Sequence, residues 1–453
     1  MRRGVVLNRI AIALGALLLG WLPAPAPRAQ EDRAALEQRV DELEHELALV
    51  KRKLEVQDET AASKGPQPTI TAGMDGFSLR SADSAWVLRL RGYTQFDGRF
   101  FTTAPASLPP GSDTFFFRRI RPILEGTLAN VVDFRIMPDF AGSVLSVQDA
   151  WANLRYLPEA QLEVGKYAGP VGLERLQTSV GTWFNEFALP TQLVPNRDLG
   201  VMLQGVVAEG VFTYQLAWMN GTTDGAGSDD TDTGNDKDLV GRVFAHPFQG
   251  TSSEALQGLG LGFATTYGRQ TGTPGSYKTS GQQTFFAFRA GVTQTGPAAR
   301  YAPQLYWYFG PVGLLAEYVN SSREFARPGF GDLRARNSAW QVSAGWAITG
   351  ERESYKGLVP TSRFDPGHGS FGAFELAARV SQLKVDSSVF ERNFADPAAN
   401  AESATLWSVG VNWYLNRAFK FALDYDNTTF RNYGDFSNRK TEGVLLGRVQ
   451  LSF

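Results

Sequence analysis

Apolar and polar residues alternate along much of the chain. Within residues 86–101, one parity carries apolar side chains such as Leu88 and Leu90, and the other carries polar ones such as Arg89 and Arg91. Because successive side chains of a strand point to opposite faces, this stretch is predicted to be a strand with one apolar and one polar face. Similar alternation recurs in VDFRIMPDF, APQLYWYFG, SAWQVSAGWAITG, TLWSVGVNWYLN and AFKFALDYDN, with Trp and Phe repeatedly at strand ends.

Two all-β architectures can use such strands. A soluble sandwich or propeller turns the apolar parity toward a packed core, whereas a membrane barrel turns it toward lipid. The composition favours the barrel, since the chain has 12% aromatic residues, 47 glycines, no cysteine and a mean hydropathy of −0.21. Aromatic girdles and a polar lumen give outer-membrane barrels such a composition. We therefore predict an all-β fold, a closed transmembrane antiparallel β-barrel, over residues 73–453.

The N-terminus has the layout of an export signal. Arginines come first, an apolar run follows at residues 10–19, and a Pro/Ala-rich stretch ends in small residues. This pattern predicts a secretory signal peptide over residues 1–29, cut near Ala29. The alternative is a single membrane anchor, but the apolar run is shorter than the ~20 residues that a spanning helix needs.

Residues 31–64 carry a different periodicity. Apolar residues occupy the a and d positions of nearly three heptads, which predicts a short helical coiled coil. In parallel helices the flanking positions would pair Arg39 with Glu44 and Glu46 with Lys51. A lone amphipathic helix is the alternative. Residues 65–72, which begin with GPQP, are predicted to be a linker. The seam consists of Leu36, Val40, Leu43, Leu47, Val50 and Leu54.

The charge of the chain is balanced. The formal net charge is −2, the leader carries four basic residues, and residues 31–64 carry six basic and ten acidic ones, so the barrel itself is also at −2. Any attraction for anions must therefore come from a local arrangement of charges rather than from the overall charge. We expect no nucleic-acid partner.

Enzyme activity, cofactors and metals are not expected. The imidazole bases available are His45, His246 and His368, and the first belongs to the predicted coiled coil. The stretch at 368–372 reads HGSFG, which is not a nucleophile elbow. No base, nucleophile and orienting group converge in the sequence.

The stretch FRRIRPILEG at 117–126 is unusual for a membrane strand. Arg119 and Arg121 share one parity and can face a watery lumen, where an arginine is tolerated. Arg118 has the opposite parity, so we expect one of the neighbouring arginines to lie at a strand end or in a loop bend. Guanidinium binds phosphate oxygens bidentately and stays charged, so clustered arginines predict an anion site. The alternative is that neighbouring carboxylates neutralise these lumen arginines.

Several motifs together resemble the phosphate-selective porin O and P family, from about Gly73 to Phe453. The resemblance implies a sixteen-stranded antiparallel barrel that forms a homotrimer, with a constriction loop folded into the lumen. The final strand, GVLLGRVQLSF, ends in Phe and is similar to the assembly signal of bacterial outer-membrane proteins. The motifs are DGFSLRSAD, LRLRGYTQFDGRFF, FFFRRIRPILEGTL, DFRIMPDF, VGKYAGPVGLERLQTS, VPNRDLGV and VGVNWYLN.

The resemblance also implies the site residues. Arg118 and Arg119 align with the arginine pair that this family places at its constriction. Arg175 aligns with a position where better-known members carry lysine, and Asp149 with an acidic residue beside the site, where it could hold an arginine in place. Arg121 has no counterpart in the family pattern and is included on parity alone.

Two long loops are also singled out. Residues 168–196 lack sustained alternation and are the expected constriction loop, with an outward loop as the alternative. Residues 221–238 are rich in Gly and Asp; the spacing of Asp230, Asp232 and Asp236 hints at calcium binding, but a solvated surface loop is the favoured interpretation.

Together these observations predict an outer-membrane channel for passive uptake of anions, with phosphate or polyphosphate preferred at an arginine-lined constriction. Its expected partners are inorganic phosphate or other anions, outer-membrane lipid and further copies of the chain. A general or organic-anion porin is the alternative. The predicted coiled coil could also tether the barrel to peptidoglycan.

Overall fold

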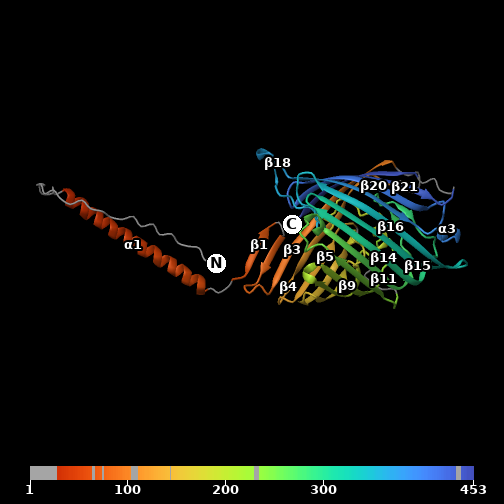
Figure 1. Cartoon of the computed structure of the whole chain (residues 1–453), viewed down its shortest axis with the longest axis horizontal. Coiled ribbons are helices and arrows are strands. Elements are labelled where there is room, and N and C mark those ends of the chain that lie inside the picture. The colour runs from red at the N-terminus through yellow and green to blue at the C-terminus, as the bar shows by residue number, and fades with distance from the viewer. Residues whose placement is uncertain are drawn as a thin grey trace. The chain divides into compact units, whose positions relative to one another are not determined.

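The computed structural model describes residues 28–63, 67–73, 76–103, 111–142, 144–228, 234–434 and 440–453. The chain divides into two compact units, Met1–Gln67 and Pro68–Phe453 (Figure 1). Residues 1–27 of the expected signal peptide lie outside the described part.

The first unit contains one long helix, α1 (Arg28–Ser63). The five seam residues whose side chains are described are each at least half exposed, so in a single chain the seam has no partner. No helix in the described ranges is long and apolar enough to cross a membrane. The exposed seam residues are Val40, Leu43, Leu47, Val50 and Leu54.

The second unit is a closed antiparallel barrel. Its main sheet has 18 described strands, of which sixteen make the ring and two, β1 and β2, form a hairpin attached to it. Four further short strands pair in two separate two-stranded sheets: β12 (Tyr277–Lys278) with β13 (Thr284–Phe286), and β17 (Phe364–Asp365) with β18 (Ser370–Phe371). The strand number agrees with the prediction. The sixteen ring strands are β3 (Val87–Thr103), β4 (Thr114–Leu128), β5 (Val132–Asp139), β6 (Ser146–Leu157), β7 (Ala160–Tyr167), β8 (Asp198–Val207), β9 (Phe212–Met219), β10 (Asp238–Ala245), β11 (Leu259–Gly272), β14 (Thr293–Phe309), β15 (Val312–Arg327), β16 (Gly331–Ala347), β19 (Ala373–Lys384), β20 (Ala401–Tyr414), β21 (Phe419–Asn432) and β22 (Glu442–Ser452).

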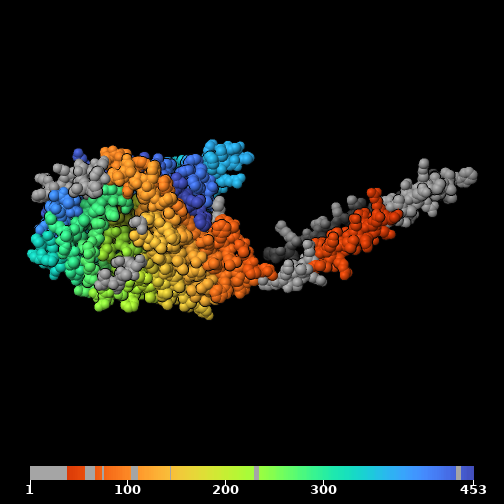
Figure 2. Space-filling model, turned by 180° about the vertical axis from the view of Figure 1, so that it is seen from behind, coloured from red at the N-terminus to blue at the C-terminus, as the bar shows by residue number. Residues whose placement is uncertain are grey.

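The last strand closes the ring. β22 pairs with β3 from Gly443↔Thr103 to Ser452↔Tyr93, which brings the two ends of the sheet together (Figure 2). The terminal residue, Phe453, continues this pairing through two backbone hydrogen bonds with Gly92, of 2.9 and 3.0 Å. Closure leaves the ring without an unpaired edge, as a barrel in lipid requires.

The hairpin corrects the predicted linker at 65–72. β1 (Thr69–Gly73) pairs with β2 (Gly76–Arg80), and β2 pairs with the start of β3 at residues 87–90. The barrel unit therefore begins at Pro68, and residues 69–72 belong to a strand. The sequence pattern did not show this because the hairpin strands are short and largely exposed.

The two faces of the barrel wall differ as the alternation predicts. Leu88 and Leu90 are 41% and 46% exposed on the outer face, whereas Gln95 and Asp97 are 0% and 2% exposed inside. An apolar outer face and a polar interior match a barrel in lipid and exclude a sandwich with an apolar core.

Connections at the two ends of the barrel differ in length. At one end they include the short turns at 129–131, 158–159 and 415–418, and at the other end several longer loops. In outer-membrane barrels the short turns are periplasmic and the long loops extracellular.

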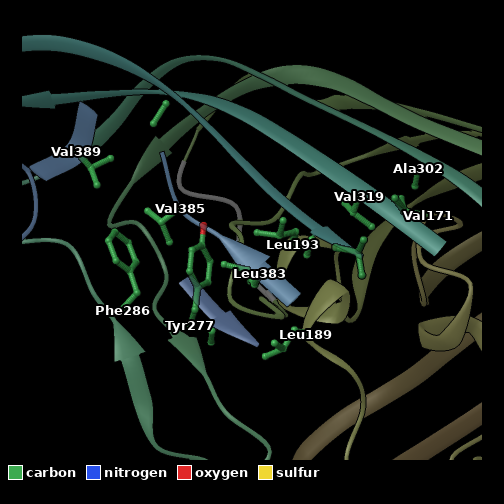
Figure 3. Packing of buried hydrophobic residues seen from close by; sticks show 14 of the residues in the cluster. Val171, Leu189, Leu193, Tyr277, Phe286, Ala302, Val319, Leu383, Val385 and Val389 are labelled. Carbon is green, nitrogen blue, oxygen red and sulfur yellow. The ribbon is translucent and has the colours of Figure 1, made fainter. Parts of the chain in front are cut away.

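The hydrophobic core lies inside the barrel, where loops pack against the wall. Leu189 and Leu193 of the short helix η2 (Leu189–Leu193) cluster with Val319 of β15 and Leu383 of β19 (Figure 3). The η2 helix also packs against β16. Burial of these side chains fixes the loop to the inner wall.

Candidate functional site

The loop between β7 and β8, residues 168–197, crosses the barrel interior. The Leu173 amide donates to a Glu317 carboxylate oxygen of β15 (2.7 Å), and the Asn185 amide donates to Asp424 of β21 (2.6 Å). Both partner strands lie across the ring from β7 and β8, and most of the loop is buried, so the expected inward fold is confirmed. We call this segment the inner loop.

A second segment supports the inner loop from the end with the short turns. The connection between β16 and β19, residues 348–372, turns inward. The Tyr355 hydroxyl donates to the Leu173 carbonyl oxygen (2.5 Å), and the Gln177 amide donates to the Tyr355 carbonyl oxygen (3.0 Å). The inner loop is thus held both by the wall and by this connection.

A β-bulge decides where the paired arginines point. In the register between β3 and β4, Gln95 lies opposite Arg119 and Phe96 opposite Phe117, so Arg118 is the extra residue. The prediction that Arg118 or Arg119 would lie at a strand end or in a loop bend is therefore wrong. A bulge shifts the alternation by one position, so both arginines face the interior.

Arg118 and Arg121 each have a carboxylate partner. The Arg118 guanidinium donates to both Glu186 oxygens of the inner loop, at 2.5 and 3.0 Å. Burial opposes ionisation of Glu186, but the charge and hydrogen bonds of Arg118 outweigh it and lower the pKa of that carboxyl to about 2. Arg121 pairs with Asp139 of β5 at 2.7 Å and also donates to the Tyr93 hydroxyl.

Arg119 and Arg175 have no ion pair within the described residues, although they are only 4% and 8% exposed. Arg119 donates to the Gln95 side-chain oxygen at 2.7 Å. Arg175 donates to Asn196 and to the Thr191 carbonyl oxygen at 3.3 and 3.2 Å. The buried Nε–H groups of both arginines have no partner. A guanidinium has five N–H donors, so both retain donors for a ligand.

The charge of Arg175 persists in this setting. Burial, followed by the repulsion of Arg197, lowers the pKa of Arg175 to about 10. Its guanidinium is therefore still cationic at neutral pH.

Two cavities share Arg175 as a lining residue. The larger, of about 1100 Å³, opens at the end with the short turns and we call it the vestibule. The smaller, of about 430 Å³, is lined by Arg118, Glu186 and residues of the long loops, and we call it the loop cavity. Among the described residues only Arg175 lines both. Arg119 and Arg121 line neither.

The vestibule has a cationic wall. Asp149 accepts a hydrogen bond from Arg197 at 2.7 Å and lies 3.7 Å from Arg135, so the arginines that it contacts are not Arg118, Arg119 or Arg175. Glu125 pairs with Arg91 and Arg135. The cationic side chains lining the vestibule outnumber the carboxylates: Arg89, Arg91, Arg135, Arg175, Arg197 and Lys356 against Glu125 and Asp149.

Comparison with known proteins shows to which family this barrel belongs. The model of the phosphate-selective porin O and P family matches residues 90–453. The chain belongs to this family. Porin O of Pseudomonas aeruginosa is 23% identical to this porin over 395 residues, which cover 77% of this chain and 84% of that protein.

Solved structures show the same fold. The outer membrane channel DcaP of Acinetobacter baumannii superposes with a TM-score of 0.55 at 11% identity, covering 84% of this porin and 100% of that chain. The anion-selective porin from Comamonas acidovorans gives 0.51 at 9% identity, covering 81% and 100%. Family and fold together place this porin in the bacterial outer membrane.

The structure brings together part of the predicted site. Arg118 and Arg175 line the loop cavity of this porin, and Arg119 lies behind it. Sequence reasoning missed Glu186 and Phe187, because no periodic pattern marks the inner loop. Asp230 and Asp232 of the possible calcium loop lie outside the described residues.

Proposed function

We propose that this porin is an outer-membrane channel for passive uptake of anions, with phosphate or polyphosphate preferred at Arg118, Arg119 and Arg175. The observation that carries the proposal is the place of Arg175. It has no ion pair within the described residues and lines both the vestibule and the loop cavity. An ion passing from one cavity to the other moves along its guanidinium.

The chemistry of the site suits a phosphate oxyanion. Arg175 has unused donors, and guanidinium donors bind phosphate oxygens with charge-assisted hydrogen bonds. Arg119 is buried and lines neither cavity, so its contribution is its charge. Rings of Arg or Lys are a recurrent device of anion and phosphate pores.

The pairing of Arg118 suits conduction. Because Glu186 already neutralises this guanidinium, an anion in the loop cavity does not meet three free charges at once. A conducting site must attract the ion and still release it. The cationic vestibule then offers the ion a favourable way out.

The descriptions of similar proteins also support anion transport. The matching family is described as phosphate-selective, and the structural neighbour from Comamonas acidovorans is described as anion-selective. One observation favours the alternative of a general or organic-anion porin: Arg118 and Arg121 are both paired with carboxylates, as in scaffolding arginines.

Assembly is also part of the proposal. We expect a homotrimer, in keeping with the solved trimer form of OmpT of Vibrio cholerae, which has a similar fold (TM-score 0.50). The exposed seam of α1 suits association of the helices of neighbouring copies. A tether to peptidoglycan through α1 is compatible with transport, and binding of the mature protein to isolated cell wall tests it.

The test is single-channel recording in a planar bilayer, with chloride current measured as phosphate is added. Native channels are expected to be anion-selective and blocked by phosphate, and Arg175→Ala should weaken the block while the pore stays open. Loss of charge-assisted hydrogen bonds of about 1.5–3 kcal/mol corresponds to a roughly 10- to 150-fold weaker block.

A matched control is Arg392→Ala, which removes the same charge from the loop between β19 and β20. It should leave the block unchanged. Equal passage of potassium and chloride in the native channel, with no phosphate block, would show a general porin.

A further inference from the structure

Phe187 lies beside Arg175 and Arg119, the two arginines of the predicted site that have no ion pair with a described residue. Its ring centroid is 4.6 Å from the Arg175 Cζ atom and 5.6 Å from the Arg119 Cζ atom. The ring is half-buried and lines the loop cavity together with Arg118 and Glu186. One aromatic side chain thus contacts two cations from different elements, the inner loop and β4.

Two buried cations this close to one ring need a compensating partner. A carboxylate is the usual choice, and Arg118 and Arg121 each have one. An aromatic ring attracts a cation through the negative face of its π-system and carries no net charge. A ring therefore repels an incoming anion less than a carboxylate would. It also leaves free the N–H donors that the anion requires.

The ring is held in place on both sides. Glu186 before it is fixed by Arg118 through its carboxylate and by Arg379, which donates to its carbonyl oxygen at 2.9 Å. Ala188 after it donates its amide to Glu174 at 2.8 Å. With its neighbours tied to β4, to β19 and to the inner loop itself, the ring is pre-organised before any anion arrives.

We propose that Phe187 is the positioning residue of the anion site, a neutral aromatic partner that stabilises the charges of Arg175 and Arg119 and leaves the N–H donors of Arg175 available for an oxyanion. This inference rests on the proposed function, because it assumes that Arg175 binds the passing anion. Phe187 would thus raise the affinity of the site for phosphate without itself binding a phosphate oxygen.

The experiment compares phosphate block of chloride current in native channels and in Phe187→Leu, Phe187→Tyr and Arg175→Ala. Leucine keeps an apolar side chain without a π-face, and a cation–π contribution of the usual size corresponds to a block weakened roughly 2- to 30-fold. Tyrosine keeps the ring and should retain the native block.

The outcomes separate the two claims. If Phe187→Leu is blocked like the native channel while Arg175→Ala loses the block, Phe187 has no positioning role and the proposed function stands. If native channels show no block, the proposed function is wrong and this inference falls with it. If the leucine variant does not assemble, Phe187→Met takes its place, and a block like the native one in that variant also overturns the inference.

Discussion

Replacing Glu186 with Gln removes the carboxylate that pairs with Arg118. Glu186 is 5% exposed and joins Arg118 through two hydrogen bonds, of 2.5 and 3.0 Å. Glutamine has the same shape and keeps one acceptor oxygen, so the inner loop should keep its position. What changes is the charge, because the loop cavity loses a negative group and Arg118 becomes available to an anion.

The expected effect is a tighter phosphate block. A hydrogen bond to a charged group contributes about 1.5–3 kcal/mol, so one additional free guanidinium should lower the half-blocking phosphate concentration roughly 10- to 150-fold. Affinity differences within one site lie mostly in the dissociation rate, so each blocked interval should lengthen by a similar factor. Phosphate conductance should fall, because the ion leaves more slowly.

The assay is the same bilayer recording, with dwell times measured in chloride after phosphate is added. A matched control, Glu391→Gln, removes a carboxylate from an exposed position in the loop between β19 and β20 and should behave like the native channel. Unchanged or weaker block in Glu186→Gln would show that Arg118 does not bind the anion even without its carboxylate partner. Arg118 would then have only a structural role, and the reasoning would be wrong.

The pH dependence adds a separate check. Arg118 holds the pKa of Glu186 at about 2 against the effect of burial, below its ordinary value of 4.5. The ion pair is therefore complete above about pH 4.5 and is lost only as pH falls toward 2. With sulfate as the probe, because its charge is constant in this range, any change of block between pH 8 and pH 5 should be the same in native channels and in Glu186→Gln. An increase at pH 5 that occurs only in native channels would contradict the assignment.

Two further predictions concern stability and assembly. Arg448→Ala removes the partner of Asp97 in a buried bidentate pair that joins β22 to β3 (2.7 Å for both hydrogen bonds), so the barrel should lose about 3–5 kcal/mol and unfold at lower urea concentration. Breaking this pair with no change in the urea midpoint would mean that it adds nothing to closure. A peptide of residues 31–64 should gain helicity with concentration by circular dichroism, and Leu47→Asn should reduce this gain, because the seam is exposed in one chain. Helicity independent of concentration would indicate a lone helix.

The barrel itself follows from the sequence. Alternation at residues 86–101 identified which side chains face lipid and which face the interior, as the exposed Leu88 and the buried Asp97 confirm. Strand periodicity is a local property, because each side chain points to the face opposite that of its neighbour. A chain that crosses lipid with many such strands can satisfy its backbone hydrogen bonds only by closing the sheet.

The geometry of the arginines depended on the tertiary structure. Two consecutive arginines cannot both face the interior in a regular strand, and nothing in FRRIR shows that the pairing with β3 leaves Arg118 as an extra residue. A bulge is a property of two strands in register.

The partners of these residues are equally non-local. Arg118 meets Glu186, which is 68 positions away, and the inner loop is anchored on Glu317 and Asp424, 144 and 239 positions from their partners. The sequence alone determined the strands, the polar lumen and the presence of arginines in it. Which of these arginines are paired with a carboxylate, and which remain free for an anion, was decided only when the inner loop folded across the barrel, because ion pairing depends on distances that no local pattern records.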